Sequence, residues 1–104
     1  MPRMTLSTAA VLYAVSTGFR HGFDIIEGTG YPSGTVYPIL RRLEDAGLLR
    51  SSWEPVTSAR AEQRPPRRYY QVTAAGALVL RDALNRFPEV ASKGSAGTLR
   101  PRPA

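Results

Sequence analysis

The chain has 104 residues, with 14 Lys and Arg against 8 Asp and Glu, so its formal net charge is +6 at pH 7. This length suits one small domain with a thin core, and the positive charge favours an anionic partner such as nucleic acid. The absence of cysteine excludes disulfides and thiolate metal sites and fits a reducing, cytoplasmic compartment. No apolar run approaches the roughly 18 residues that a membrane span requires, so no membrane association is expected.

The same composition offers little basis for an enzyme. His21 is the only histidine, cysteine is absent, and no pair of carboxylates lies on a recognisable scaffold. No acid–base or nucleophile set can therefore be assembled. No metal or other cofactor is expected either, because His21 has no partner ligands.

Residues 5–17 are predicted to form the first helix, with Thr5 or Ser7 as its cap and Gly18 at its end. Its side chains leave almost no polar face, which indicates that the helix is covered on more than one side. One candidate for that cover is a partner subunit.

Residues 21–28 predict a short second helix that turns Phe23 and Ile26 inward, with Ile25 as a further inward candidate. The Gly-Thr-Gly sequence at 28–30 ends it.

A third helix is predicted to begin between Ser33 and Thr35 and to run to Ala46, with Gly47 as its left-handed stop. If Thr35 is the cap, Pro38 falls in the first turn, whereas a cap at Ser33 predicts a mild kink. The apolar positions follow the spacing of a helix packed on a core; they are Val36, Ile39, Leu40 and Leu43. The opposite face offers hydroxyl, phenol and guanidinium groups, which can hydrogen-bond base edges and phosphates.

Alternating patterns at 48–54 and 67–73 predict two antiparallel strands of a hairpin, joined by a polar, basic loop at 55–66. Thr73 is expected to cap a last helix at 74–87, which Pro88 ends. The domain is thus expected to cover residues 1–88, and the tail 89–104 is expected to be disordered.

The fold class predicted from these elements is mainly α with a small β-hairpin. Three helices, two strands and a final helix follow one another in the order of a winged helix-turn-helix that carries an extra C-terminal helix. We expect that helix to serve dimerisation.

Several segments of this sequence resemble those of the PadR-like family of transcriptional regulators. The matching segments are HGFDI at 21–25, PSGTVYPILRRLE at 32–44, AGLL at 46–49, Trp53-Glu54, RPPRRYYQVT at 64–73 and Gly76. The resemblance covers about residues 6–86, and it is closest to a compact branch of the family with a short C-terminal part. It implies a homodimeric repressor that binds an inverted repeat in double-stranded DNA, with the third helix in the major groove and the hairpin, or wing, at the minor groove. Some members release DNA when a small hydrophobic effector binds between the subunits, and the sequence identifies no such effector.

The candidate functional residues fall into three groups. Those expected to contact DNA from the third helix are Ser33, Gly34, Thr35, Tyr37, Pro38, Arg41 and Arg42. Arg42 is the weaker of its two arginines, because it could pair with Glu44 or Asp45 instead. Those expected to contact DNA from the wing are Arg60, Arg64, Arg67 and Arg68, of which Arg68 shares its strand face with Val72. Those expected at a dimer interface are Leu6, Ala9, Leu12, Tyr13, Leu80, Leu84 and Phe87.

Three aromatic residues receive structural interpretations. Trp53 is expected to pack within the hairpin, and Tyr69 and Tyr70 are expected to be structural. The alternative function is a winged-helix adaptor or effector-sensing module that binds proteins. The outward face of the third helix discriminates the two, because a basic, hydroxylated face favours DNA and an apolar face favours protein.

Overall fold

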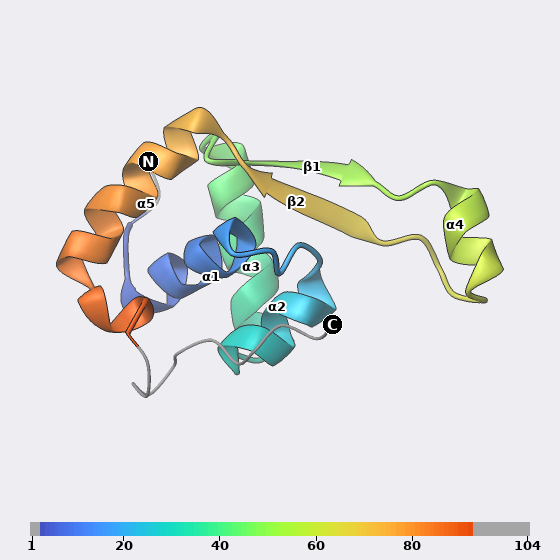
Figure 1. Cartoon of the computed structure of the whole chain (residues 1–104), viewed down its shortest axis with the longest axis horizontal. Coiled ribbons are helices and arrows are strands. Elements are labelled where there is room, and N and C mark those ends of the chain that lie inside the picture. Colours follow the sequence, from blue (N-terminus) through green and yellow to red (C-terminus); the bar gives the residue numbers. More distant parts are fainter. Residues whose placement is uncertain (1–2, 93–104) are drawn as a thin grey trace.

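The computed structural model describes residues 3–92 and forms a winged helix (Figure 1). Its mainly helical composition with one antiparallel hairpin confirms the predicted fold class. Within these residues, no helix combines the length and apolar character needed to cross a membrane. The elements in chain order are α1 (Leu6–Ser16), α2 (Gly22–Thr29), α3 (Ser33–Asp45), β1 (Leu49–Trp53), α4 (Val56–Ala61), β2 (Arg68–Val72), α5 (Ala74–Arg86) and a short 3-10 turn, η1 (Pro88–Val90).

The first helix, α1, is the central element of the body. Thr5 caps it by accepting a hydrogen bond from the backbone N–H of Thr8 at 3.2 Å. The helix contacts α2, α3, α5, β2 and η1. Elements of the same chain therefore bury its apolar side chains on several sides. Ala9 and Leu12 are both 0% exposed. The prediction that these two side chains meet a partner subunit is therefore wrong, because they have no surface to offer.

The recognition-helix candidate, α3, begins at Ser33 and follows Pro32, which makes no side-chain cap. Neither Ser33 nor Thr35 is the cap, and Pro38 lies inside the helix, past its first turn. The four predicted apolar positions are all buried, at 0–2% exposure. Gly47 then adopts the left-handed conformation, with φ of 77°, as predicted for the stop.

The hairpin pairs Leu49 with Val72, Ser51 with Tyr70 and Trp53 with Arg68. This register places the same residues on one face as the predicted alternation does. The segment just before α2 contacts β2 through an isolated β-bridge between His21 and Tyr69, and the Tyr70 N–H donates to the Arg20 carbonyl at 2.7 Å. Beyond that root the hairpin projects away from the helices, with α4 at its far end (Figure 1).

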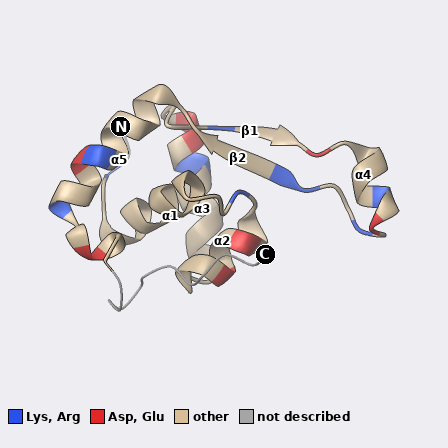
Figure 2. Cartoon of the chain, in the orientation of Figure 1, with Lys and Arg blue, Asp and Glu red and all other residues tan. Residues whose placement is uncertain are grey.

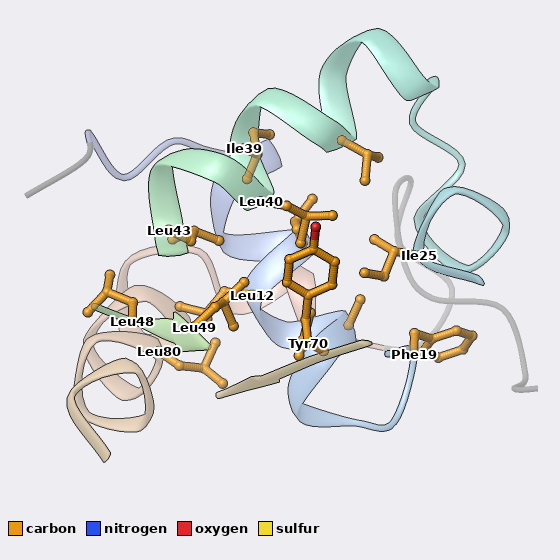
Figure 3. Close-up of a cluster of buried hydrophobic side chains, with 14 residues drawn as sticks. Leu12, Phe19, Ile25, Ile39, Leu40, Leu43, Leu48, Leu49, Tyr70 and Leu80 are labelled. Carbon is orange, nitrogen blue, oxygen red and sulfur yellow. The ribbon is translucent and has the colours of Figure 1, made fainter. Parts of the chain in front are cut away.

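The core lies where the hairpin root meets the helices. Tyr70 points from β2 into one cluster with Leu12 of α1, Leu40 of α3 and Leu49 of β1 (Figure 3). Burial raises the pKa of the Tyr70 phenol, so the ring is uncharged there. This side chain joins the wing to the body and confirms the structural role predicted for it.

Two elements differ from the sequence interpretation. The segment predicted as a loop at 55–66 contains α4, which begins after Pro55 and buries Ala59. The tail begins with η1, whose Val90 is 3% exposed against the second core cluster around Ala83. Packing therefore continues past the predicted domain end at residue 88, and the disorder expected at 93–104 falls outside the described residues.

Phe23 is also placed differently. It was expected to point inward from α2, but its side chain is 64% exposed. The inward side of this short helix presents Ile25 and Gly28 instead, and the ring of Phe19 packs against Gly28. Phe19 is 3% exposed, so it is the phenylalanine of this region that joins the core.

A test of the packing of α5 against the segment just before β1 uses two glycines. Gly76 lies against the backbone carbonyl of Leu48, and an added Cβ would meet that oxygen. Gly76→Ala should therefore lower the free energy of unfolding by about 1–3 kcal/mol, the usual cost of overpacking. Gly34 in α3 has nothing within 4 Å of such a Cβ, so Gly34→Ala should stabilise by up to about 1 kcal/mol through helix propensity. Urea denaturation measures both, and equal effects of the same sign would contradict this packing.

Candidate nucleic-acid interface

The outward face of α3 presents polar and cationic groups. Tyr37 is 49% exposed, and Arg41 and Arg42 are also exposed. With Pro38 these three residues line a shallow hollow of about 370 Å³ on the helix surface. Ser33 and Gly34 are exposed and Thr35 is half-buried at the helix start. Because the apolar stripe is buried behind them, this face is basic and hydroxylated rather than apolar.

Tyr37 is held from behind by α2. Its ring edge and hydroxyl lie against Gly22, where any Cβ would overlap them. Gly22 is buried and opens α2. The glycine of the His-Gly pair thus lets the tyrosine ring approach the second helix edge-on while about half of the residue stays exposed to solvent.

His21 caps α2 through its own side chain. Its Nδ1 accepts from the backbone N–H of Asp24 at 3.4 Å, and its ring meets Tyr69 edge-on at a centroid distance of 5.8 Å. Burial, followed by the charge of Arg67, lowers the pKa of His21. A neutral imidazole keeps the lone pair that this cap requires.

Glu54 anchors the far part of the wing. Its carboxylate accepts two bonds from the guanidinium of Arg64, at 2.5 and 2.9 Å, and one from the Arg67 N–H at 3.1 Å. The Tyr69 hydroxyl donates to it at 3.3 Å. The side chain of Glu54 is only 6% exposed, and the hydrogen bonds from Arg64 hold its pKa at about 2, below the ordinary 4.5. This bidentate pair connects the end of β1 to the strand that returns from α4.

This contact changes the role of Arg64. The prediction placed Arg64 on DNA, but its side chain is 18% exposed and its guanidinium also reaches Glu62 at 3.2 Å. Its charge is thus already compensated by carboxylates of the same wing. Arg64 thus shapes the wing, and its contact with DNA stays a prediction.

Arg68 makes a second internal contact at the outer end of β2, opposite Trp53. It donates to the Ser51 hydroxyl at 2.8 Å and pairs with Glu44 of α3 at 3.2 Å. Its guanidinium also lies 5.6 Å from the ring centroid of Trp53. Glu44 therefore serves Arg68 rather than Arg42, and the pairing weighed for Arg42 with Glu44 is not formed.

Trp53 does not pack within the hairpin as predicted, because its side chain is 65% exposed. The hairpin has one buried face only at its root, where Leu49 and Tyr70 meet the helices. Trp53 shares that face but lies farther along the ribbon, beyond the body. The alternation of residues along the strand predicts which side chains share a face of the hairpin. It does not predict how far along the hairpin the helices cover that face.

Four of the arginines predicted to contact DNA have no ion-pair partner in the described part of the chain. Among residues 3–92, no carboxylate lies within salt-bridge distance of Arg41, Arg42, Arg60 or Arg67. Figure 2 shows basic residues on α3, on β2 and at the hairpin tip, with acidic residues also on α3 and at the tip, and charges of both signs on α5. Arg41 and Arg42 lie on the predicted recognition helix, and Arg60 and Arg67 lie on the predicted wing.

The Glu54 anchor predicts an acid-sensitive wing. Because the folded-state pKa lies below the ordinary value, the stability contributed by this carboxylate is present above pH 4.5 and is lost as the pH falls towards 2. A ¹³C-detected titration of the Glu54 carboxyl should therefore show a midpoint near 2, and a midpoint near 4.5 would contradict the anchor. Glu54→Gln should destabilise more than Glu62→Gln, because the Glu62 side chain is 64% exposed and exposed ion pairs contribute only about 0–1 kcal/mol.

Comparison with known proteins supports the same assignment. The model of the transcriptional regulator PadR-like family matches residues 11–82. The chain is similar to a PadR-like transcription factor from Bacteroides fragilis, at 28% identity over 79% of this chain and 80% of that one, with a TM-score of 0.65. It is similar to a PadR family regulator from Eggerthella lenta at 28% identity, covering 80% and 76%, with a TM-score of 0.59. A Streptococcus mutans protein matches at 26% identity, covering 84% and 82%, with a TM-score of 0.68. No curated protein matches the sequence. The chain belongs to the PadR-like family of transcriptional regulators, which are DNA-binding proteins.

Proposed function

We propose that this protein is a sequence-specific repressor that binds an inverted-repeat operator as a homodimer. The observation that carries the proposal is the two-sided character of α3. Its apolar side chains are buried at 0–2% exposure, while Tyr37, Arg41 and Arg42 face outward beside a basic hairpin. A helix of this kind, flanked by a wing, suits insertion into a major groove.

The two parts of the surface are assigned different tasks. Tyr37 and Arg41 lie on the exposed face of α3, where they would reach base edges and so read sequence. Arg60 and Arg67 lie on the wing with no carboxylate partner among the described residues, and they would meet phosphates. The hydroxyls of Ser33 and Thr35, at the start of α3, would approach the sugar–phosphate backbone of the DNA.

The proposed dimer surface lies on the flank of the body formed by α1 and α5. Leu6 is 38% exposed, and Tyr13, Leu84 and Phe87 are partly exposed beside the core. These side chains are the members of the predicted dimer set that a single chain leaves open. A stable pair would bury about 1,200 Å² or more in total.

A groove beside this flank offers a place for the small hydrophobic effector that some relatives use. It lies between α1, β2 and α5 and has a volume of about 810 Å³. Val15, Leu80 and Leu84 supply apolar lining, and Arg20 and Arg81 stand at its edges. An effector bound here would contact both β2 of the wing and the dimerisation helix.

The first test separates sequence reading from general affinity. Fragments selected from a genomic library define an operator, and binding is then measured on that operator and on a random duplex. Tyr37→Ala or Arg41→Ala should cost about 1–3 kcal/mol on the operator and much less on the random duplex. Arg60→Ala or Arg67→Ala should weaken both duplexes similarly and lower the salt slope by about one unit per lost contact.

Two outcomes would contradict this division. Equal losses on both duplexes for the α3 variants would remove the base-reading role of Tyr37 and Arg41. Selection that recovers no enriched sequence, with binding unaffected by any of the four variants, would favour the protein-adaptor function instead.

The dimer is tested by light scattering at micromolar concentration. Leu6→Arg and Leu84→Arg should lower the mass from that of a pair to that of one chain, because each places a charge within the proposed interface. Leu78→Arg is the matched control, since Leu78 is 63% exposed on the outer side of α5, and it should keep the mass of a pair. Circular dichroism verifies that each variant is folded. A wild-type mass of one chain, or an unchanged mass in both folded interface variants, would contradict the proposed dimer.

A further inference from the structure

Three aromatic side chains stand exposed around one cleft between the body and the wing. Phe23 of α2 is 64% exposed, Tyr37 of α3 is 49% exposed and Trp53 of β1 is 65% exposed. The cleft that they line has a volume of about 430 Å³. Exposed aromatics that gather at a hollow mark a contact site, because each leaves a large apolar area in water.

The walls of the cleft are held in place by the fold. Tyr37 lies against Gly22, and the buried Tyr70 closes the floor. On the wing side, Glu44 and Ser51 hold the guanidinium of Arg68, which lies 5.6 Å from the Trp53 ring centroid. The cleft is therefore preformed, and only the outward surfaces of its aromatic rings remain to be covered.

The rim of the cleft is cationic. Arg67 and Arg68 both line it. Arg68 is already paired with Glu44, but Arg67 has no carboxylate within salt-bridge distance among the described residues. An occupant must therefore combine an apolar surface for the rings with a negative charge for Arg67.

The cleft is continuous with the proposed reading face. Tyr37 lines both this cleft and the neighbouring hollow formed with Pro38, Arg41 and Arg42. A partner that covers Tyr37 on α3 therefore also borders the cleft lined by Phe23 and Trp53. A groove-bound duplex brings its flanking strand to this position, and that strand alternates deoxyribose rings with phosphates.

We propose that this cleft grips the sugar–phosphate backbone of the duplex strand that borders the groove occupied by α3. Phe23 and Trp53 pack on deoxyribose, and Arg67 pairs with the adjoining phosphate. The proposal rests on the proposed function and adds two aromatic contact residues to it. Because a backbone has the same chemistry in every sequence, the grip acts on operator and random DNA alike.

The sole tryptophan makes the contact directly measurable, since all intrinsic tryptophan emission comes from Trp53. The probe is a mixed-sequence 30-base-pair duplex at low salt, with binding followed in parallel by anisotropy of labelled DNA. The Trp53 emission should change in step with binding. Phe23→Ala and Trp53→Ala should each weaken binding by about five- to tenfold, the usual cost of truncating an aromatic contact, and Trp53→Phe should recover most of the loss.

Val56→Ala is the matched control, because Val56 is 56% exposed on the same hairpin and does not line the cleft. It should bind like the wild type. Two results would contradict the proposed role of the cleft in backbone binding and leave the proposed function intact. One is normal DNA binding with no change in Trp53 emission, and the other is full affinity in the Phe23 and Trp53 variants. Failure of the wild type to bind any duplex would overturn the proposed function as well, so the two failures are distinguishable.

Discussion

One face of α3 is sealed into the core through Val36, Leu40 and Leu43, each 0% exposed. This burial sets the rotation of the helix about its own axis. Turning the helix would expose the apolar stripe to water, at a free-energy cost of roughly 25 cal/mol per Å² of exposed apolar surface. The same rotation directs Tyr37 and Arg41 outward. The polar face of α3 is therefore a consequence of core packing, and its chemistry is available for a partner without any rearrangement.

The wing depends on two internal anchors of different kinds. At its root, Tyr70 enters the core and its N–H pairs with the Arg20 carbonyl. Farther out, Glu54 joins the two sides of the hairpin through Arg64. A two-stranded ribbon is marginal by itself, so these contacts keep the wing beside α3. They also divide its arginines into Arg64, which shapes the wing, and Arg60 and Arg67, which stay available.

Periodic features of the sequence were enough to predict the fold. The stripe of α3 and the strand alternation depend on local spacing, and the caps at Thr5 and Thr73 form as predicted. The errors concern residues whose environment is set by distant segments. Phe23 and Phe19 are both aromatic and apolar, and only the fold shows that Phe19 packs against Gly28 while Phe23 is exposed. The anchoring role of Glu54 has no local signal in the sequence, because Arg64 returns to it across α4. The basic α4 was read as a loop because a six-residue helix shows too little periodicity.

The central claim is that the outward face of α3 and the wing together form the DNA-binding surface. The most direct measurement is a two-dimensional ¹H–¹⁵N NMR titration of the full chain with an operator duplex. The account predicts that the largest shift changes fall within residues 33–42 and 60–68 and at the indole N–H of Trp53, while the outer face of α5 around Leu78 stays unchanged. Changes concentrated on α5, with residues 33–42 unperturbed at saturation, would contradict it.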